Sequence, residues 1–287
     1  MSILRFAIQY LFAPLFFIGF IGSSLWLMSL AIDKIWLLGL LIPAIATSFV
    51  AERILPFEDI WNKPKSDVGR DWIHALVNET TIFLMVAAIP YLLLLPIGFN
   101  VWPKNLDLWL QLLIAILMAD FGITMAHYFS HKIEGLWRFH AIHHSVERMY
   151  GFNGLMKHPL HQGFELLIGT TPLILMGMPM EVGALLGFSV AIQLMLQHSN
   201  VDMKVGPLIY IWAVAPGHRH HHLASKTKGD VNFGLFTMFW DHLLGTFVNQ
   251  HPSPRAGELG VAGRDDFPNN YLGQLIEPFR NLKRINK

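Results

Sequence analysis

Long apolar runs, separated by short polar connections, fill much of this chain. Four of them suit helices that cross a hydrocarbon core, which takes about 20 apolar residues. These runs cover residues 7–32, 35–50, 82–99 and 106–125. Two shorter runs, at 164–178 and 182–196, predict a helical hairpin that enters the membrane only in part, with a helical pair buried inside the protein as the alternative. The pattern therefore predicts an all-α membrane bundle.

Positive charges are unevenly distributed among the connections between these runs. The connection after the second run carries Arg53, Lys63, Lys65 and Arg70, whereas the one between the third and fourth runs carries only Lys104. Because Lys and Arg are enriched in cytoplasmic connections, we expect the first of these connections and both termini to be cytoplasmic. The number of runs then brings every histidine group to the same face.

The composition agrees with a membrane protein. Charged residues make up only 14% of the chain, whereas a soluble domain carries about a quarter. The formal net charge of +1 and the lack of a long basic run argue against a nucleic-acid partner. Cysteine is absent, which excludes disulfides, cysteine-ligated zinc, iron–sulfur clusters and a thiolate nucleophile. The 15 histidines are therefore the principal candidates for chemistry.

Most of these histidines fall in groups with the spacing of metal ligands. The groups are His127 and His131; His140, His143 and His144; and His218, His221 and His222. On a helix, residues three or four apart share one face, while adjacent residues diverge by about 100°. An adjacent pair can therefore serve two neighbouring metals. His198, at the end of the last apolar run, and Asp202, one helical turn beyond it, are further candidate ligands.

So many imidazoles exceed the needs of one metal and predict a two-metal centre. Neutral imidazole binds iron, zinc, copper and nickel, so the ligands alone leave the metal open. A site beside apolar helices suits a lipid chain, and attack on an unreactive C–H bond needs O2 and a redox metal, which favours iron. A zinc-dependent membrane hydrolase is an alternative, although the general base of an H-E-x-x-H motif is missing. A metal transporter, the third alternative, would place its histidines along a transmembrane path.

The order of the histidine groups, HxxxH, HxxHH and HxxHH, resembles the fatty acid hydroxylase/sterol desaturase superfamily. Further matching segments are Asn153-Gly-Leu-Met-Lys-His-Pro-Leu160, Gln197-His-Ser-Asn200, Asp230-Val-Asn-Phe-Gly234 and Trp240-Asp-His-Leu-Leu-Gly-Thr246. The resemblance covers about residues 115–248. It implies two iron ions, O2, a lipid substrate in the membrane and a separate electron-transfer protein as the external electron donor. The compact build, without an attached cytochrome b5 domain, resembles the bacterial members, so we expect a bacterial inner membrane.

Several polar residues near the histidine groups are expected to orient the ligands or to join them. They are Asp120, Asn153, His158, His161, Asp230, Asn232 and Asp241. Asp120 lies inside the fourth apolar run, and an acid at such a depth usually serves a functional site. His161 stands where the resembling family often has an acidic residue. For Asp230, Asn232 and Asp241, the alternative is a role in turns and helix caps.

Together these features predict an integral membrane helical bundle of about four transmembrane helices plus a short membrane-embedded helical hairpin, with a cytoplasmic helical cap that carries the histidine-ligated two-metal site. We expect N-terminal transmembrane helices in 1–106, the catalytic domain in 107–250 and a C-terminal tail in 251–287. The expected reaction is O2-dependent hydroxylation of a C–H bond in a fatty acyl, sterol or polar-lipid chain. Desaturation of a lipid at the same site is the alternative. The sequence predicts no oligomeric state.

Overall fold

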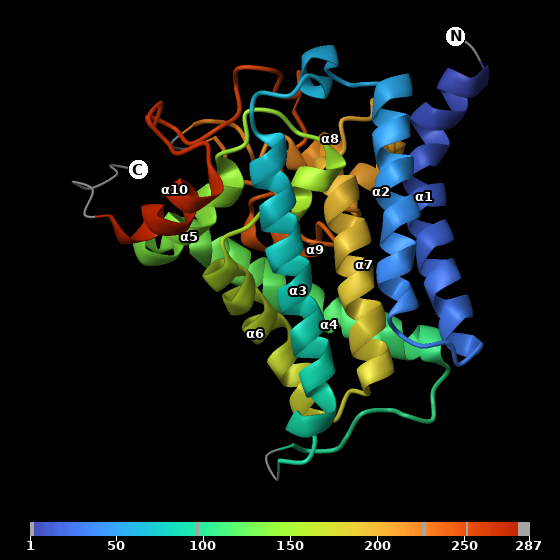
Figure 1. Ribbon diagram of the computed structural model, residues 1–287. Helices are drawn as coiled ribbons and strands as arrows, with labels where there is room; N and C mark the ends of the chain where they lie inside the picture. Colours follow the sequence, from blue (N-terminus) through green and yellow to red (C-terminus); the bar gives the residue numbers. More distant parts are fainter. Residues whose placement is uncertain (1–2, 96–97, 226–227, 251, 281–287) are drawn as a thin grey trace.

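The chain folds as a helical bundle, described in a computed structural model for residues 3–95, 98–225, 228–250 and 252–280 (Figure 1). Its α-helices are α1 (Ile3–Ser29), α2 (Trp36–Ile54), α3 (Val68–Leu92), α4 (Leu108–Lys132), α5 (Glu134–His144), α6 (Pro159–Leu175), α7 (Met180–His198), α8 (Ala215–His218), α9 (Phe239–Leu244) and α10 (Tyr271–Ile276). Short 3-10 helices are η1 (Asp59–Asn62), η2 (Gly151–Leu155), η3 (Gly206–Tyr210) and η4 (Glu277–Phe279). Apart from isolated bridge pairs, the residues in these ranges form no β-strand, which confirms the all-α prediction.

Five helices of the described chain are long and apolar enough to cross a membrane, namely α1, α2, α3, α4 and α7. About four spans and a partial hairpin are expected from the sequence, and the second arm of that hairpin, α7, is the fifth candidate. Helix α7 lies at the centre of the bundle, in contact with α1, α2, α3 and α4 (Figure 1). Most of its length is buried inside the protein, where Gln193 Nε2 and Gln197 Nε2 each lie 2.9 Å from the Leu235 carbonyl oxygen. The central helix therefore holds a cap segment through buried amides.

The third span differs from the sequence prediction. It was expected at 82–99, whereas α3 begins at Val68 and ends at Leu92. The early part of α3 is polar but buried, because His74 Nδ1 and Asn78 Nδ2 lie 2.9 Å and 3.1 Å from the Lys157 carbonyl oxygen. A hydropathy criterion leaves such polar residues out of a predicted span. Here, however, their side chains face the cap rather than lipid. The start of the predicted span was therefore wrong by several turns.

Close packing of α4 against α6 sets the position of the first histidine pair. A Cβ atom added at Gly122 on α4 would lie 2.8 Å from both Gly169 Cα and the Ile168 carbonyl oxygen on α6. Small residues of this kind allow two helix backbones to approach closely in a membrane. Helix α4 then continues without a break to Lys132, so that His127 and His131 belong to the same helix as the apolar run. The fourth span thus delivers two candidate ligands directly.

The helical cap lies at one end of the bundle, the end at which α1 begins (Figure 1). Buried Glu52, near the end of α2, joins two cap segments to the bundle, because its Oε1 accepts hydrogen bonds from the amides of Gly151 (2.6 Å) and Asn200 (3.1 Å). The Gly151 segment begins η2, and the Asn200 segment follows α7. Both segments are close in sequence to candidate histidines. The predicted domain divisions at 106/107 and 250/251 stay predictions.

Candidate metal centre

Nine buried histidines form two clusters within the described residues. One cluster contains His127, His131, His140, His144 and His221, and the other contains His143, His198, His218 and His222. In each cluster, one ring nitrogen of every member lies within 4.8 Å of those of the others. The structure therefore brings together all nine histidines that the sequence singles out as ligands.

Helical phase explains why the groups divide between the two clusters. Helix α5 places His144 in the five-histidine cluster and His143 in the four-histidine cluster, with their rings 5.8 Å apart and inclined at 86°. His221 and His222 also divide between the two clusters, although they lie in the turn that follows α8. The clusters adjoin, because the rings of His144 and His222 stack at 4.6 Å. Adjacent histidines thus serve neighbouring positions, as their angular separation on a helix predicts.

The spacing of the Nε2 atoms fits metal binding. The Nε2–Nε2 distances are 2.8 Å for His127–His221, 3.1 Å for His131–His144, 3.0 Å for His140–His144, 3.0 Å for His198–His222 and 3.2 Å for His218–His222. With a metal–nitrogen bond of about 2.1 Å, two ligands at a right angle lie about 3.0 Å apart, and two at the tetrahedral angle lie about 3.4 Å apart. The spacing of these nearest pairs is therefore compatible with two imidazoles that bind one metal.

In five of the nine histidines, an acceptor holds the opposite ring nitrogen and fixes the direction of the imidazole. The Nδ1 atoms lie 2.9 Å from the Phe233 oxygen for His127, 2.8 Å from the Val231 oxygen for His221, 2.9 Å from the Met156 oxygen for His143 and 3.1 Å from the Leu194 oxygen for His198. His131 Nδ1 instead lies 2.9 Å from Asp230 Oδ1. Because carbonyl oxygens only accept, Nδ1 carries the proton and the Nε2 lone pair is left for a metal.

Burial also keeps the ligands in the form that binds metals. Burial, followed by repulsion from neighbouring imidazoles, lowers the pKa of His140, His144 and His222 well below the ordinary value of 6.5. The same causes lower the pKa of His218 and His221. These rings are neutral at pH 7, and a neutral imidazole needs to lose no proton before it binds a metal.

Three of the polar residues expected near the ligands act on the loop that follows the third histidine group. Asp120 Oδ1 accepts a hydrogen bond from the Phe236 amide (2.7 Å), and Asp241 Oδ1 accepts one from the Phe233 amide (2.8 Å). Asn232 adopts a φ of +53° and ties the loop to the chain before and after it. Asp120 was expected to orient an imidazole directly, whereas its contacts reach the ligands through the backbone of this loop.

Three other expected residues lie outside both clusters. Asp202 Oδ2 accepts a hydrogen bond from Gln9 Nε2 (2.7 Å), because α7 ends at His198 and the helical spacing that would align the two residues stops there. His158 caps α6 through its Nδ1, which accepts from the Leu160 amide (3.1 Å). Asn153 Nδ2 donates to the Arg148 carbonyl oxygen (2.8 Å), in the segment before η2.

His161 borders the five-histidine cluster together with two residues that sequence reasoning missed. Its ring lies 4.6 Å from that of His140, its Nε2 lies 2.9 Å from Ser130 Oγ, and its Nδ1 lies 3.7 Å from Glu165 Oε1. Glu165 in turn pairs with buried Lys157. His140, His161 and Glu165 could together hold a cation by distance alone. The signal for Glu165 was present, since it is a single acid inside an apolar run.

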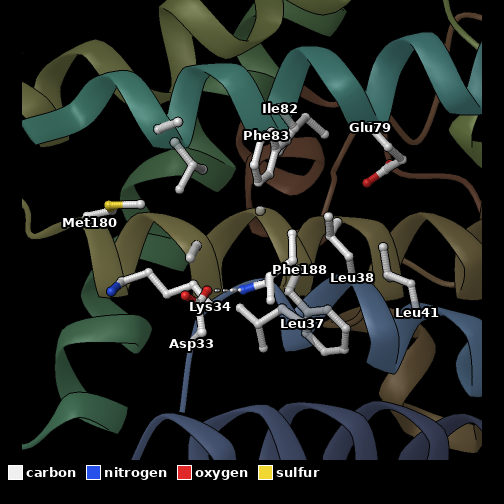
Figure 2. Close-up of a pocket in the computed structure, with 15 residues that line it drawn as sticks. Asp33, Lys34, Leu37, Leu38, Leu41, Glu79, Ile82, Phe83, Met180 and Phe188 are labelled. Atoms are coloured by element: carbon white, nitrogen blue, oxygen red, sulfur yellow. Dashed lines mark hydrogen bonds between the residues drawn. The ribbon is translucent and has the colours of Figure 1, made fainter. Parts of the chain in front are cut away.

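A separate cavity of about 260 Å³ lies between α2, α3 and α7 (Figure 2). Apolar side chains such as Leu41 and Phe188 line it, and Figure 2 shows Glu79 and Lys34 toward its opposite ends. None of the residues that line this cavity belongs to either histidine cluster of the described chain. The cavity is therefore distinct from the metal centre.

Fold and site together define a membrane protein with a buried, paired histidine metal centre. A family model for fatty acid hydroxylases matches residues 112–246. The chain is 32% identical over 259 residues to the ornithine lipid hydroxylase OlsE of Rhizobium tropici, which covers 87% of this chain and 77% of that protein. The chain belongs to the fatty acid hydroxylase family, which confirms the resemblance seen in the histidine motifs.

Other relatives match about half of the chain. Alkylglycerol monooxygenase of Danio rerio is 30% identical over 147 residues, which is 51% of this chain and 32% of that protein. The human alkylglycerol monooxygenase is 30% identical over 133 residues, which is 46% of this chain and 29% of that protein. The chain therefore covers about a third of these monooxygenases. No solved structure matches the chain. Family and site identify an integral membrane lipid hydroxylase, an oxidoreductase with a histidine metal site.

Proposed function

We propose that this protein uses two iron ions and O2 to hydroxylate a C–H bond of a membrane lipid. The observation that carries the proposal is the pair of adjoining histidine clusters, in which nine Nε2 or Nδ1 atoms converge in two sets. The proposed ligands are His127, His131, His140, His144 and His221 for one iron, and His143, His198, His218 and His222 for the other. Asp202 is not included, because its carboxylate binds Gln9.

Iron is favoured over zinc by the number of the ligands. A structural zinc is almost always four-coordinate and tetrahedral, and a catalytic zinc usually has three protein ligands. A cluster of five imidazoles with Nε2 atoms about 3 Å apart exceeds that requirement. Imidazole is also a good ligand for iron. The H-E-x-x-H motif of zinc peptidases is missing, which weakens the hydrolase alternative.

The residues of the chain then have distinct roles. When bound, the two irons would supply the electrons and the O2 chemistry that convert a C–H bond into an alcohol. The Nδ1 contacts with Phe233, Val231 and Asp230 hold the imidazoles in place. Burial of the rings excludes bulk water from the centre, which limits side reactions of a strong oxidant.

We base the proposed substrate on the relative that this chain matches over most of the relative's length. The Rhizobium protein is an ornithine lipid hydroxylase, and the match covers 87% of this chain, far more than the histidine groups alone. We therefore propose an amino-acid-containing membrane lipid as the substrate and 107–250 as the catalytic unit. Two electrons per turnover would come from a separate electron-transfer protein. Similarity to a Rhizobium protein supports a bacterial inner membrane, and the uneven positive charge of the connections supports a cytoplasmic position for the metal centre and both termini.

Comparison of the lipids of cells that express the protein or a variant tests this proposal. We expect wild-type cells to contain a lipid class with one additional oxygen, and cells with His143→Ala to lack it. The control is His242→Ala, because His242 is exposed and lies in neither cluster. A lipid that instead loses two hydrogens would favour desaturation. An unchanged lipid profile in all three strains, with the protein present and loaded with iron, would contradict the proposal.

A further inference from the structure

An apolar stripe is exposed on the last described helical segment, α10 with η4. Leu272, Ile276 and Phe279 have exposed fractions of 67%, 53% and 63%. Their spacing of four and three residues places them on one face of a helical segment. Gln274 and Glu277 on the opposite face are buried. The segment is therefore amphipathic, with its polar face turned inward and its apolar face outward, the reverse of a helix in water.

Contacts with the rest of the protein fix this orientation. Gln274 Oε1 lies 2.9 Å from His74 Nε2 on α3, and Gln274 Nε2 donates to Ser145 Oγ (2.9 Å). Glu277 Oε1 accepts a hydrogen bond from Arg264 Nη2 (2.7 Å). These buried polar contacts fix the position of the helical segment on the rest of the protein. The outward direction of the apolar stripe is thus a property of the fold.

The stripe lies beside the end of α3 that carries further exposed apolar residues. On α3, Trp72, Ile73 and Leu76 surround His74 in sequence and are 50%, 44% and 69% exposed. Helix α10 packs against this part of α3, at the end of the bundle that holds the histidines (Figure 1). Because α3 is one of the helices that can span the membrane, its exposed residues here mark the level at which the bilayer meets the cap.

Basic residues follow the stripe directly. Arg280 has a side chain that is 52% exposed. The sequence continues with Lys283, Arg284 and Lys287, which lie outside the described residues. An apolar stripe beside several positive charges is typical of segments that lie in the interface of a bilayer and contact anionic headgroups.

We propose that Tyr271–Phe279 is an interfacial anchor whose partner is the bilayer surface on the histidine side of the protein. Leu272, Ile276 and Phe279 insert at the boundary between headgroups and acyl chains. The anchor also supports the start of α6, because His158 Nε2 donates to the Leu275 carbonyl oxygen (3.2 Å). The bilayer thereby becomes part of the support for the helix that carries His161. This inference does not depend on which lipid the centre oxidises.

The lack of native cysteine permits a direct test by single-site labelling. Leu272→Cys, Ile276→Cys and Phe279→Cys are labelled with an environment-sensitive fluorophore, and the full-length protein is placed in vesicles of phosphatidylcholine and phosphatidylglycerol. Ala256→Cys is the matched control, since Ala256 is exposed in the same C-terminal region but outside the helical segment. Quenching by nitroxide-labelled lipid and by aqueous iodide is then compared at the four positions.

We expect the three stripe positions to show blue-shifted emission, strong quenching by the lipid nitroxide and little quenching by iodide. Ala256→Cys should show the opposite. The result that overturns the proposal is strong iodide quenching, without lipid quenching, at all four positions. Retention of bound metal by each labelled variant shows that the fold is intact, so that an aqueous signal cannot be assigned to unfolding.

Discussion

Asp230 links a candidate metal ligand to the surface and carries the most specific prediction. Its Oδ1 lies 2.9 Å from His131 Nδ1, and its Oδ2 lies 3.1 Å from Lys132 Nζ. Burial raises the pKa of Asp230, but the contacts with His131 and Lys132 outweigh that effect and hold the pKa well below its ordinary value. The group is therefore a carboxylate at neutral pH. Asp230→Ala removes both the orienting acceptor and the negative charge that makes the His131 ring a stronger ligand.

The size of the effect follows from the role of this contact. Loss of such an outer partner costs about 10–100-fold in metal affinity, which corresponds to about 1.4–2.7 kcal/mol. Lys132→Gln is the matched control, because Lys132 binds the same carboxylate from the exposed side. A surface ion pair contributes about 0–1 kcal/mol, so this variant should lose less than about fivefold in affinity. Asp230→Asn should lie between the two, since its amide oxygen still accepts a hydrogen bond.

Chelator competition against the purified, metal-loaded protein measures these affinities. For Asp230→Ala we expect one of the two metals to be released at about 10–100-fold lower chelator activity, while the metal of the four-histidine cluster is retained. Equal metal release from Asp230→Ala and Lys132→Gln would refute the assigned role of Asp230. Simultaneous loss of both metals would show instead that the contact supports the fold as a whole.

Three further predictions concern stability and the separate cavity. Arg148 Nε and Nη2 lie 2.6 Å and 2.9 Å from the two carboxylate oxygens of Asp67. Burial raises the pKa of Asp67, but the contact with Arg148 outweighs burial and lowers the pKa from its ordinary value of 3.8. The stabilisation of the fold by this ion pair is therefore complete above about pH 4 and is lost as the pH falls through the lowered pKa. The thermal unfolding temperature of Asp67→Asn in detergent should therefore vary less with acidification than that of wild type. Glu165→Gln leaves buried Lys157 without its partner and should cost about 3–5 kcal/mol, whereas the double variant Lys157→Met/Glu165→Leu should unfold in denaturant nearer to wild type. Ala184→Phe fills the cavity between α2, α3 and α7 and should leave metal content and turnover unchanged, a result that a tenfold loss of turnover would contradict.

The grouping of the candidate histidines could be predicted in part because their spacing is a local property of the chain. His127 and His131 lie one turn apart on α4, and the adjacent pair His143 and His144 divides between the two clusters as helical phase on α5 predicts. His198 was found in the same way, as the last residue of an apolar run. No long-range contact is needed to see any of these relations. The prediction of nine clustered histidines therefore depended on periodicity and little else.

The parts that could not be predicted depend on where segments distant in sequence meet. Helix α3 begins earlier than hydropathy indicates because His74 and Asn78 are satisfied by a carbonyl some 80 residues away. Asp202 was placed on the face of His198 by a helical spacing that ends with α7. The roles of Glu52 and Lys157 arise only from tertiary contacts. An isolated charge in an apolar run was a usable signal for Asp120 and would have been one for Glu165 as well.

The central claim is that the histidine centre inserts an oxygen atom from O2 into a lipid. The most direct test supplies the iron-loaded protein with a chemical reductant, an ornithine-containing lipid and ¹⁸O2, and records the mass of the product lipid. We expect an alcohol whose new oxygen is ¹⁸O, with no product from His143→Ala. An alcohol labelled only from water, or a product that lacks two hydrogens and contains no new oxygen, would contradict the claim.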